Sequence, residues 1–457
     1  MTSRPDPVGQ SPGNGDAETI FALSSGRLPA GVAVLRVSGP ATFRVVKILA
    51  GSLPEFRQME VRTIRSRSGE ILDRGLVVVF PGPQSFTGED SAELHLHGSR
   101  AVVAAVSREL ASHAGVRLAS AGEFTLRAFA NGKLDLTKAE ALADLVEAET
   151  DAQRRFALGN SSGRNATLYE GWRSTLTDCR AMIEAELDFP EEEDIPPLVS
   201  TGVWTTVTRL AAAIDSHLKA FHRSEIIREG YRVAIIGAPN AGKSSLLNAL
   251  AGRDAAIVSN EPGTTRDLIE VALDLDGLKV ILTDTAGLRS NAGAVEREGI
   301  ARAMEAARKA DLVLVLSEDG SASAIDGIQI DARTLLVHSK IDLVEERDSR
   351  ETARLSDRLA ISTRTGEGVS GLIEEIARRA AEAAGGTTDV LPFRERHFAE
   401  LTAAHQALLV FQHMQSAPLE LAAEQLRLAS NHLARIVGAI DVEDILDAVF
   451  SRFCIGK

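Results

Sequence analysis

The chain has 457 residues, a length sufficient for about three domains, and its 44% hydrophobic and 25% charged residues are typical of a soluble globular protein. Its formal net charge of −14 excludes a generally basic nucleic-acid surface, so RNA would need a local basic patch or a basic partner. The two cysteines, Cys179 and Cys454, are too few for a disulfide framework and lack metal-ligand spacing, which indicates a reducing cytoplasm. No run of about 18 apolar residues is present, so no membrane-spanning segment is expected.

Residues 1–17 are rich in Pro, Gly and polar side chains and have no apolar signal-peptide core, so we expect a disordered lead-in. Residues 18–133 contain the strand-like runs VAVLRVSG, GLVVVF and SAELHLHG, separated by Gly and Pro turn signals, which predicts an α+β domain. His95 and His97 share one strand face. Alternation explains this spacing and no third ligand accompanies them, so a metal site is not predicted.

Three further segments follow, and the hydrophobic pattern of the sequence changes at each of the two boundaries between them. Residues 134–228 carry Leu and Ala on one face and charges on the other, which predicts helices. Residues 229–384 alternate apolar strands with helices, which predicts a mostly parallel sheet, and Asp276-Gly277 marks a hairpin that adds one antiparallel edge strand. Residues 385–457 are helical again. We therefore expect a multidomain fold, with an N-terminal α+β domain and a central helical domain into which an α/β domain is inserted.

The stretch GAPNAGKSS, Gly237 to Ser245, matches the pattern G-x-x-x-x-G-K-[ST] of a phosphate-binding loop. It follows the strand YRVAII and opens the helix SLLNAL, so backbone N–H groups and the helix N-terminus can cradle phosphate oxygens. Lys243 would reach the β- and γ-phosphates and Ser244 the Mg²⁺. The inserted domain is thus expected to be a Ras-like G domain. Its predicted loop contacts are Asn240, Ala241, Gly242, Lys243, Ser244 and Ser245.

Two downstream segments are typical of nucleotide switches. Asp284-Thr285-Ala286-Gly287 ends the strand KVILT, where a carboxylate can act through water on Mg²⁺ and the Gly287 N–H can sense a γ-phosphate. Between the two motifs lies GTTRD, in which Thr265 is placed to close over the metal. We expect both segments to be ordered by the γ-phosphate and released after hydrolysis.

Two loops are predicted to recognise the base. The motif SKID follows the strand TLLVH and places Asp342 where its carboxylate can accept two hydrogen bonds from guanine, which favours GTP over ATP. Ser339 stands where this motif usually has Asn, and Thr363, in the loop STR, stands where Ala is commoner. The residues predicted to surround the base are Ser339, Lys340, Asp342, Ser362, Thr363 and Arg364.

The expected catalytic apparatus differs from that of Ras-like enzymes. Leu288 occupies the position of the Gln that orients the attacking water. Arg266 and Arg289 are candidates for an arginine finger, although either could form an ordinary salt bridge. A monovalent cation is a physical substitute, and Asn240 offers a side-chain carbonyl beside the phosphates. Taken alone, such an Asn is more often a turn residue.

Five stretches outside the GTPase motifs occur over nearly the full length: VLRVSGP, FTGED, GEFTLRAFANGKLDLTKAEALADL, LDFPEEED and the closing FCIGK. With them the chain resembles the MnmE family, also called TrmE, of GTPases that modify the wobble uridine (U34) of certain tRNAs. The resemblance implies a folate-binding-like N-terminal domain through which a homodimer forms. It also implies a flavoprotein partner, MnmG (GidA), which carries FAD and joins a heterotetramer.

The same resemblance implies the chemistry. An aminomethyl or carboxymethylaminomethyl group would be added to uridine C5, with a one-carbon unit from a tetrahydrofolate derivative, 5-formyl- or methylenetetrahydrofolate. Cations can pair with the glutamate carboxylates of a folate, and a carboxylate can accept from pterin N–H groups. Taken alone, these side chains are more often members of surface ion pairs. The implied folate ligands are Arg36, Glu89, Lys133 and Lys457.

The C-terminal FCIGK would bring Cys454 near the folate as a catalytic thiol. A prenylation box is a weaker interpretation, because the last three residues fit that motif badly. The stretch LSSGRLPAG departs from the glycine-rich pattern that the family usually has in the first domain.

In the G domain the resemblance assigns metal and catalytic roles. Glu296 would orient the attacking water through a second water, although by itself it is only an acid near a helix start. Lys243 and Asp284 would also contribute to catalysis. The implied Mg²⁺ ligands are Ser244 and Thr265, and the implied K⁺ ligands are Asn240, Ser259, Glu261 and Thr264, of which Ser259 and Thr264 would also contact GTP.

Three functions are therefore compared. The first is a K⁺-stimulated GTPase that acts with a flavoprotein in tRNA modification. The second is a ribosome-assembly switch, which would co-sediment with a ribosomal subunit and bind no folate. The third is a stand-alone folate aminomethyltransferase with a regulatory G domain. The folate-like motifs disfavour the second, and the acidic charge without a flavin fingerprint disfavours the third.

Overall fold

The computed structural model describes residues 18–188, 198–252, 256–257, 269–284, 304–318, 330–343, 358–386, 389–415, 417–440, 446, 449–451, 453 and 456. The chain divides into two compact units, of which the first contains Met1–Glu140 and Val437–Lys457 and the second Ala141–Ile436. The finer domain boundaries at residues 133, 228 and 384 stay a prediction. The predicted disordered lead-in, residues 1–17, lies outside the described residues.

A six-stranded sheet with the order β3-β4-β5-β2-β1-β6 forms the centre of the first unit. The β1–β6 pair is parallel and the other four pairs are antiparallel. Because side chains alternate between faces, Leu35 and Leu94 join the core beneath the helices α1 and α2, whereas Arg36 and Glu93 share the opposite face. The elements are β1 (Thr19–Leu23), β2 (Ala30–Ser38), α1 (Thr42–Ala50), β3 (Glu60–Arg65), β4 (Ile71–Phe80), β5 (Ser91–Gly98), α2 (Arg100–Ala111), β6 (Val116–Leu118) and α3 (Glu123–Ala130).

The C-terminal segment of the chain belongs to the first unit. The ring of Phe450 lies 6.4 Å from the ring of Phe129 in α3, and Ser24 Oγ donates a hydrogen bond of 2.8 Å to the carbonyl oxygen of Gly456. Gly456 has a φ of 103°, and a Cβ at this position would collide with the carbonyl oxygen of Leu23. Only glycine allows this close approach of two backbones.

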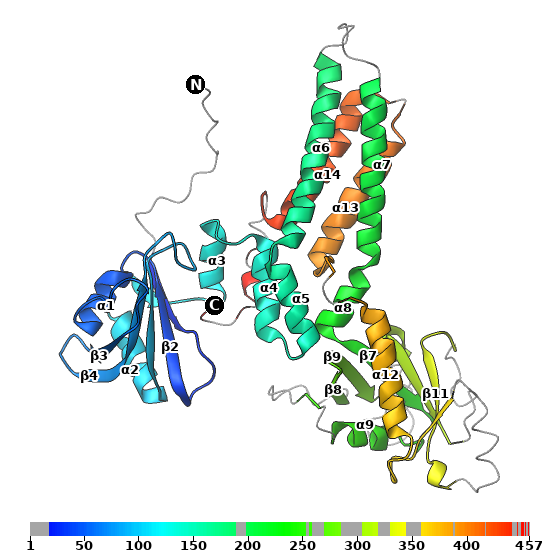
Figure 1. Cartoon of the computed structure of the whole chain (residues 1–457), viewed down its shortest axis with the longest axis horizontal. Coiled ribbons are helices and arrows are strands. Elements are labelled where there is room, and N and C mark those ends of the chain that lie inside the picture. Colours follow the sequence, from blue (N-terminus) through cyan, green and yellow to red (C-terminus); the bar gives the residue numbers. More distant parts are fainter. Residues whose placement is uncertain are drawn as a thin grey trace, which may run out of the picture. The chain divides into compact units, whose positions relative to one another are not determined.

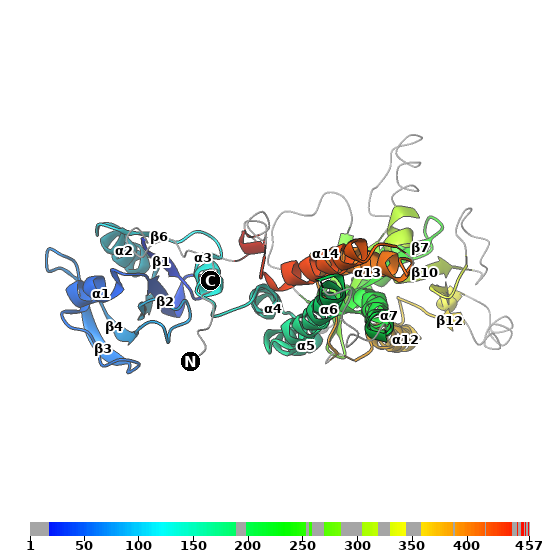
Figure 2. The same cartoon turned by 90° about the horizontal axis from the view of Figure 1, so that it is seen from above.

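Helices dominate one part of the second unit. Figure 1 and Figure 2 show α6, α7, α13 and α14 side by side. Within this bundle a hydrogen bond of 3.0 Å joins the buried Tyr169 Oη to His217 Nε2. The helices are α5 (Asp151–Ser161), α6 (Arg164–Asp188), α7 (Leu198–Lys219), α8 (Phe221–Glu229), α13 (Glu395–Gln412) and α14 (Leu419–Val437), and α4 (Leu136–Glu147) begins in the first unit and ends in the second.

The second unit also contains a six-stranded sheet with the order β12-β11-β10-β7-β9-β8. Its pairs are parallel except for the β8–β9 hairpin, whose turn residues Asp276 and Gly277 have φ values of 53° and 85°. The predicted fold class, including the antiparallel edge, is thereby confirmed. The elements are β7 (Tyr231–Gly237), α9 (Lys243–Ala251), β8 (Ile269–Leu275), β9 (Leu278–Asp284), β10 (Leu312–Ser317), β11 (Thr334–His338), the short 3₁₀ helix η2 (Ile341–Leu343), β12 (Arg358–Ala360) and α12 (Val369–Ala384).

The sheet and the helices of the second unit share one hydrophobic core. Phe156 of α5 packs edge-on against Phe393, with ring centroids 6.3 Å apart, and both belong to the cluster that contains the buried strand residues. The β8–β9 turn also contacts α5, where the Ala152 N–H donates to the Gly277 carbonyl oxygen at 2.9 Å. The sheet that carries the nucleotide motifs is therefore packed firmly onto the adjoining helices.

Candidate functional site

The phosphate loop connects β7 to α9. Gly237 ends β7 beside β10, and a Cβ there would collide with the Leu316 carbonyl oxygen, so glycine is required. Asn240 and Gly242 both have positive φ values, 67° and 96°, and Gly242 is the N-cap of α9. The first N–H groups of a helix lack intrahelical partners, so this loop presents hydrogen-bond donors and the positive end of a helix dipole to an anion.

The side chain of Lys243 is folded back over the loop. Its Nζ donates hydrogen bonds of 2.8 Å to the carbonyl oxygens of Gly237 and Ala238, and the residue is buried. Burial lowers the pKa of Lys243, and the nearby Asp284 opposes that shift. The ammonium is held at the loop by neutral oxygens and can be presented to phosphate.

Ser244 and Asp284 form the candidate Mg²⁺ site. Asp284 ends β9 and is fully buried, and Ser244 Oγ donates a hydrogen bond of 2.6 Å to its Oδ2. A hydroxyl and a carboxylate are oxygen donors of the kind that Mg²⁺ prefers, so the two residues fit this metal. The structure thus brings together two groups that lie 40 positions apart in the sequence.

The two loops predicted to recognise the base meet at the ends of β10, β11 and β12. Ser339 is buried, and its hydroxyl donates to the Ser317 carbonyl oxygen at 3.3 Å, which ties the loop after β11 to β10. Asp342 Oδ1 accepts a hydrogen bond of 2.6 Å from Ser362 Oγ, and its Oδ2 pairs with Arg364 at 2.8 Å. The Ser362 hydrogen bond is the largest of the causes that lower the pKa of Asp342. The carboxylate is therefore charged and oriented at neutral pH.

The remaining predicted nucleotide contacts lie nearby or outside the described residues. Ala241 is buried, Asn240 and Ser245 are exposed, Thr363 is half-buried, and Lys340, with a φ of 58°, pairs with Glu318 at 2.5 Å. The predicted site residues outside the described part of the chain are Ser259, Glu261, Thr264, Thr265, Thr285, Ala286, Gly287, Glu296, Cys454 and Lys457.

A second polar site lies in the first unit, on the sheet face that α3 covers. The Arg36 guanidinium pairs with Glu93 at 3.1 Å and lies over the rings of Phe86 and Phe124, 5.5 and 5.8 Å from their centroids. A guanidinium over two rings is held in place by cation–π attraction as well as by its ion pair. The Arg36 guanidinium is thus held against two aromatic rings.

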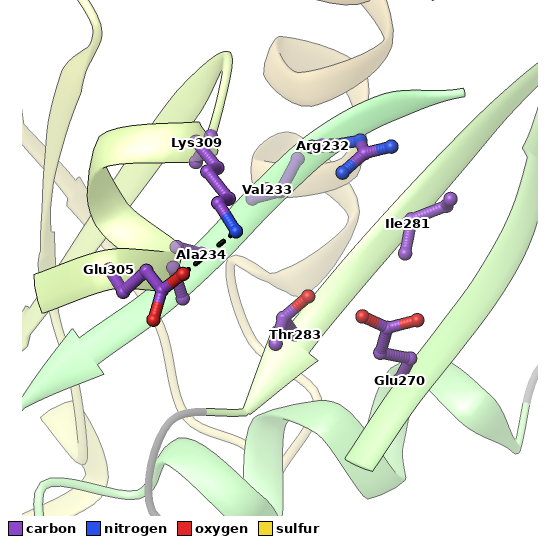
Figure 3. A pocket seen from close by; sticks show the side chains of 10 residues that line it. Arg232, Val233, Ala234, Glu270, Ile281, Thr283, Glu305 and Lys309 are labelled. Carbon is purple, nitrogen blue, oxygen red and sulfur yellow. Dashed lines mark hydrogen bonds and ion pairs between the residues drawn. The ribbon is translucent and has the colours of Figure 1, made fainter. Parts of the chain in front are cut away.

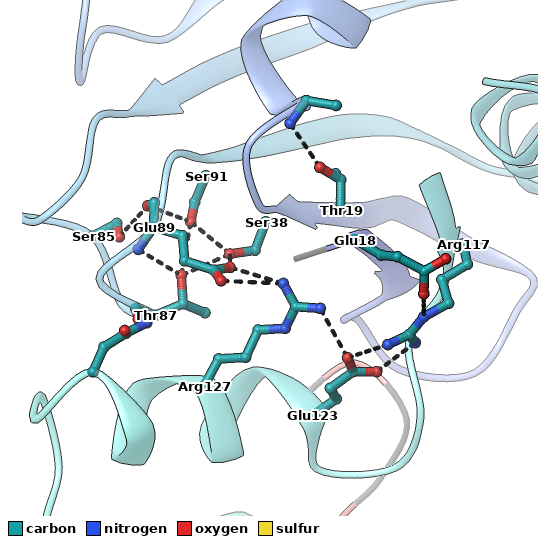
Figure 4. A network of polar contacts seen from close by, with 12 residues as sticks. Glu18, Thr19, Ser38, Ser85, Thr87, Glu89, Ser91, Arg117, Glu123 and Arg127 are labelled. Atoms are coloured by element: carbon teal, nitrogen blue, oxygen red, sulfur yellow. Dashed lines mark hydrogen bonds and ion pairs between the residues drawn. The ribbon is translucent and has the colours of Figure 1, made fainter. Parts of the chain in front are cut away.

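Glu89 occupies the other part of this site (Figure 4). Its Oε2 accepts from Ser38 Oγ at 2.8 Å, and Arg127 Nη1 lies 3.2 and 3.1 Å from its two oxygens. Ser38 is also within hydrogen-bond distance of Thr87 and Ser91, at 2.7 and 3.2 Å, and these three hydroxyls are buried. Ser38, Thr87, Ser91 and Arg127 are not among the site residues predicted from the sequence, although the motifs VSGP, FTGED and GEFTLRAF contain three of them.

Lys133 is the third implied folate ligand that lies in the described part of the chain. The residue is exposed, and its backbone N–H donates to the Ala128 carbonyl oxygen at 2.8 Å, while no side-chain contact recorded for the described residues joins it to Arg36 or Glu89. Arg36 and Ser38, by contrast, are two positions apart in β2 and therefore share a sheet face, and the Ser38 hydroxyl donates a hydrogen bond to Glu89. Two of the four implied folate ligands are therefore brought together.

A cavity of about 330 Å³ lies elsewhere in the second unit, beside β7, β8 and β9 (Figure 3). Its lining includes Arg232, Glu270, Thr283 and the ion pair of Glu305 with Lys309, whose N···O distance is 2.8 Å. None of the residues predicted to bind the nucleotide lines it. The assignment of the nucleotide site therefore depends on the loop geometry and not on this cavity.

The described residues contain no cluster of three His, Cys, Asp or Glu side chains that could hold a metal ion. The histidines noted in the sequence have carboxylate partners, because His95 contacts Glu93 at 3.2 Å and His97 contacts Asp73 at 2.7 Å. Within the same described part of the chain, no helix is both long and apolar enough to cross a membrane.

The fold and the site together define a P-loop GTPase. The strand–loop–helix with Lys243, the Ser244–Asp284 pair and the oriented Asp342 are the parts that this class uses for phosphate, Mg²⁺ and guanine.

Comparisons with known proteins identify the family. The family model described as "GTP-binding protein TrmE N-terminus" matches residues 19–133, and the model described as "MnmE helical domain" matches residues 136–454. The "tRNA modification GTPase MnmE" of Mesorhizobium japonicum is 56% identical over 96% of this chain and 99% of that protein, and the protein of the same name from Chelativorans sp. is 53% identical over 96% and 98%. The chain therefore belongs to the MnmE family, and it is a GTP hydrolase of tRNA modification.

Among solved structures, the G domain of the T. maritima FeoB iron transporter is 27% identical, covers 34% of this chain and 99% of that chain, and has a TM-score of 0.24.

The family predicted from the sequence is confirmed by the curated relatives, as is the GTPase activity in tRNA modification. The roles of individual site residues stay predictions.

Proposed function

We propose that the protein is a K⁺-stimulated GTP hydrolase that acts with a flavin-carrying partner on the wobble uridine of tRNA. It adds an aminomethyl or carboxymethylaminomethyl group to C5 and takes the one-carbon unit from a tetrahydrofolate derivative. The observation that carries this proposal is the position of the C-terminal segment. Gly456 lies against Leu23 and Ser24 in the same compact unit as Arg36 and Glu89, so the chain end and the polar site belong to one structural unit.

GTP hydrolysis requires stabilisation of charge on the transferring phosphoryl group. Lys243 binds the phosphates, Ser244 and Thr265 hold Mg²⁺, and Asp284 acts on the metal through water. Asn240 is exposed, has a left-handed backbone conformation and lies two residues before Gly242 in the loop, so its amide oxygen fits a K⁺ ligand. The ion would supply positive charge in place of an arginine finger. Ser259, Glu261 and Thr264 complete its ligands, and Glu296 orients the attacking water through a second water.

The first unit binds the folate. Glu89 is a hydrogen-bond acceptor suited to pterin N–H groups, and the guanidinium of Arg36 suits a carboxylate of the glutamate tail. Lys133 and Lys457 supply further cations, and Cys454 supplies the thiol for the modification chemistry.

The partners follow from charge and exposure. The net charge of −14 is unsuited to tRNA capture by this chain alone, which supports a complex with a second protein in the cytoplasm. Apolar side chains at and near the β3 edge are exposed, among them Phe56 at 56%, Val61 at 53% and Ile71 at 58%. An exposed apolar edge of a sheet supports self-association, and we place the homodimer contact in the first unit.

Hydrolysis in matched KCl and NaCl tests the cation. We expect GTP hydrolysis by the purified chain to be faster in KCl, and this advantage to disappear in Asn240→Ala. Equal wild-type rates in both salts would contradict the K⁺ mechanism. In a strain that lacks its own family member, the intact gene should restore the modified nucleoside and Asp284→Asn should not; equal rescue would contradict the coupling of hydrolysis to modification.

A further inference from the structure

Alternating charges form a continuous chain across the first unit (Figure 4). Arg117 pairs with Glu18 at 2.5 Å and with Glu123 at 2.7 Å. Arg127 then joins Glu123, at 2.9 Å, to Glu89, at 3.1 Å. The side chain of Arg127 is only 14% exposed, and it bridges helix α3 to the loop that precedes β5.

Glu123 fixes the helix side of this bridge. Its carboxylate accepts from both Arg117 and Arg127 and also from the Ser120 backbone N–H at 2.9 Å. Burial by itself would raise the pKa of Glu123, but these hydrogen bonds outweigh it and lower the pKa to about 2. The carboxylate is therefore charged at neutral pH, and it holds one end of the Arg127 guanidinium in a fixed direction.

Glu89 receives the other end of the guanidinium. Its Oε2 accepts from Ser38 and Arg127, whereas the hydrogen bond described at Oε1 comes from Arg127. A carboxylate has about four lone-pair positions, so the carboxylate keeps acceptor capacity for a ligand. The side chain of Glu89 is 20% exposed, which leaves room for approach from solvent.

We propose that Arg127 is the positioning residue that aims the Glu89 carboxylate at the pterin N–H donors of the folate. This inference rests on the proposed folate function. Arg127 acts through Glu89 and does not itself touch the ligand.

A purely structural role for Arg127 makes a different prediction. If the residue only ties α3 to the loop, its replacement weakens all folate analogues by one factor. If it aims Glu89, its replacement removes the discrimination between ligands that differ in pterin donors. A site built to hydrogen-bond a donor rejects the analogue that lacks it, because its own polar group is then left without a partner.

The test measures binding of 5-formyltetrahydrofolate and of its 2-desamino analogue to the purified full chain by titration calorimetry. We expect wild type to prefer the parent compound by about tenfold or more. Arg127→Lys should reduce this preference to about threefold or less, because a lysine cannot reach both carboxylates with the same geometry. Glu123→Gln, which keeps Arg127 but loosens its anchor, should give an intermediate preference. Arg108→Lys, at an exposed position of α2, is the matched control.

Thermal unfolding of each variant establishes that it is folded. Weaker binding of both ligands by Arg127→Lys at an unchanged ratio, with the same result for Glu123→Gln, would overturn the positioning role and leave the folate site standing. Failure of wild type to bind 5-formyltetrahydrofolate would instead remove the folate site itself and this inference with it.

Discussion

The nucleotide site and the polar site of the first unit arrange their charges in opposite ways. The Lys243 ammonium is held by two neutral carbonyl oxygens at a helix N-terminus, so positive charge is presented to a ligand. In the polar site, by contrast, Arg127 lies between the carboxylates of Glu89 and Glu123. The first arrangement attracts a highly charged anion, whereas the second would attract an anion only weakly and would have to select a ligand by hydrogen-bond direction.

This difference in charge arrangement predicts different effects of substitutions at the nucleotide site and at the polar site. Removing a charge from the nucleotide site removes an interaction with the reacting phosphate directly. Removing a charge from the polar site changes the geometry of the remaining pairs, because Arg117 and Arg127 each pair with two carboxylates. Large changes in rate are therefore expected at the first site, and changes in selectivity or pH response at the second.

Lys243→Ala should have the largest effect. Loss of a preorganised cation at the phosphates should reduce kcat for GTP hydrolysis by about a hundredfold to a thousandfold. Lys309→Ala, at a surface position paired with Glu305, is the control and should leave kcat unchanged. Steady-state phosphate release measures both. A loss below tenfold in Lys243→Ala would mean that the ammonium does not act on the transition state, and the contrast between the two sites would weaken.

Replacing the side chains that contact Asp342 should have a moderate effect on GTP binding, and the effect should be larger for the buried side chain than for the exposed one. Ser362 is fully buried and its hydroxyl orients Asp342, so Ser362→Ala should weaken GTP binding by about fivefold, or about 1 kcal/mol. The side chain of Arg364 is 73% exposed, and Arg364→Ala should change binding by less than about threefold. Titration with GTP and with ATP measures affinity and preference. An equal loss in both variants would show that the ion pair matters as much as the buried hydroxyl.

The pH response of the first unit should be the smallest effect. The folded pKa of Glu123 is about 2, below its ordinary value of 4.5, so its contribution to stability is fully present above about pH 4.5. That contribution is lost as the pH falls from about 4.5 toward 2. Glu123→Gln should therefore flatten the acid dependence of unfolding in this window relative to wild type. Hydrogen exchange of α3 amides gives the local measurement, and identical pH profiles would contradict the assignment.

The sequence predicted the two sites to very different extents. The phosphate loop is one contiguous motif between a strand and a helix, so the sequence indicated its backbone geometry. Asp284 and Asp342 were predicted as site residues because each comes after an apolar strand-like run. The polar site is assembled from β2, the loop before β5 and α3. Pairing between Arg127 and Glu89 depends on how α3 packs on the sheet, which local patterns do not contain.

The strands of the first unit also show that local sequence patterns predict some elements and miss others. The patterns of β2, β4 and β5 are long and apolar enough to be recognised. β6 has three residues and exists because it pairs with β1, and β3 mixes charged and apolar side chains at the sheet edge. Tertiary pairing and not local propensity decides whether such segments become strands.

The placement of Val437–Lys457 in the first unit has a consequence for how the protein is made. Residues 1–140 leave the ribosome early, but the segment that packs against Phe129, Leu23 and Ser24 is synthesised only after residues 141–436. At the usual 5–20 residues per second, the nascent first unit waits on the order of 15 to 60 s for its final piece. Completion of this unit is thus delayed until the whole second unit has been synthesised, so a truncated translation product would leave the nascent sheet without its last packing partner.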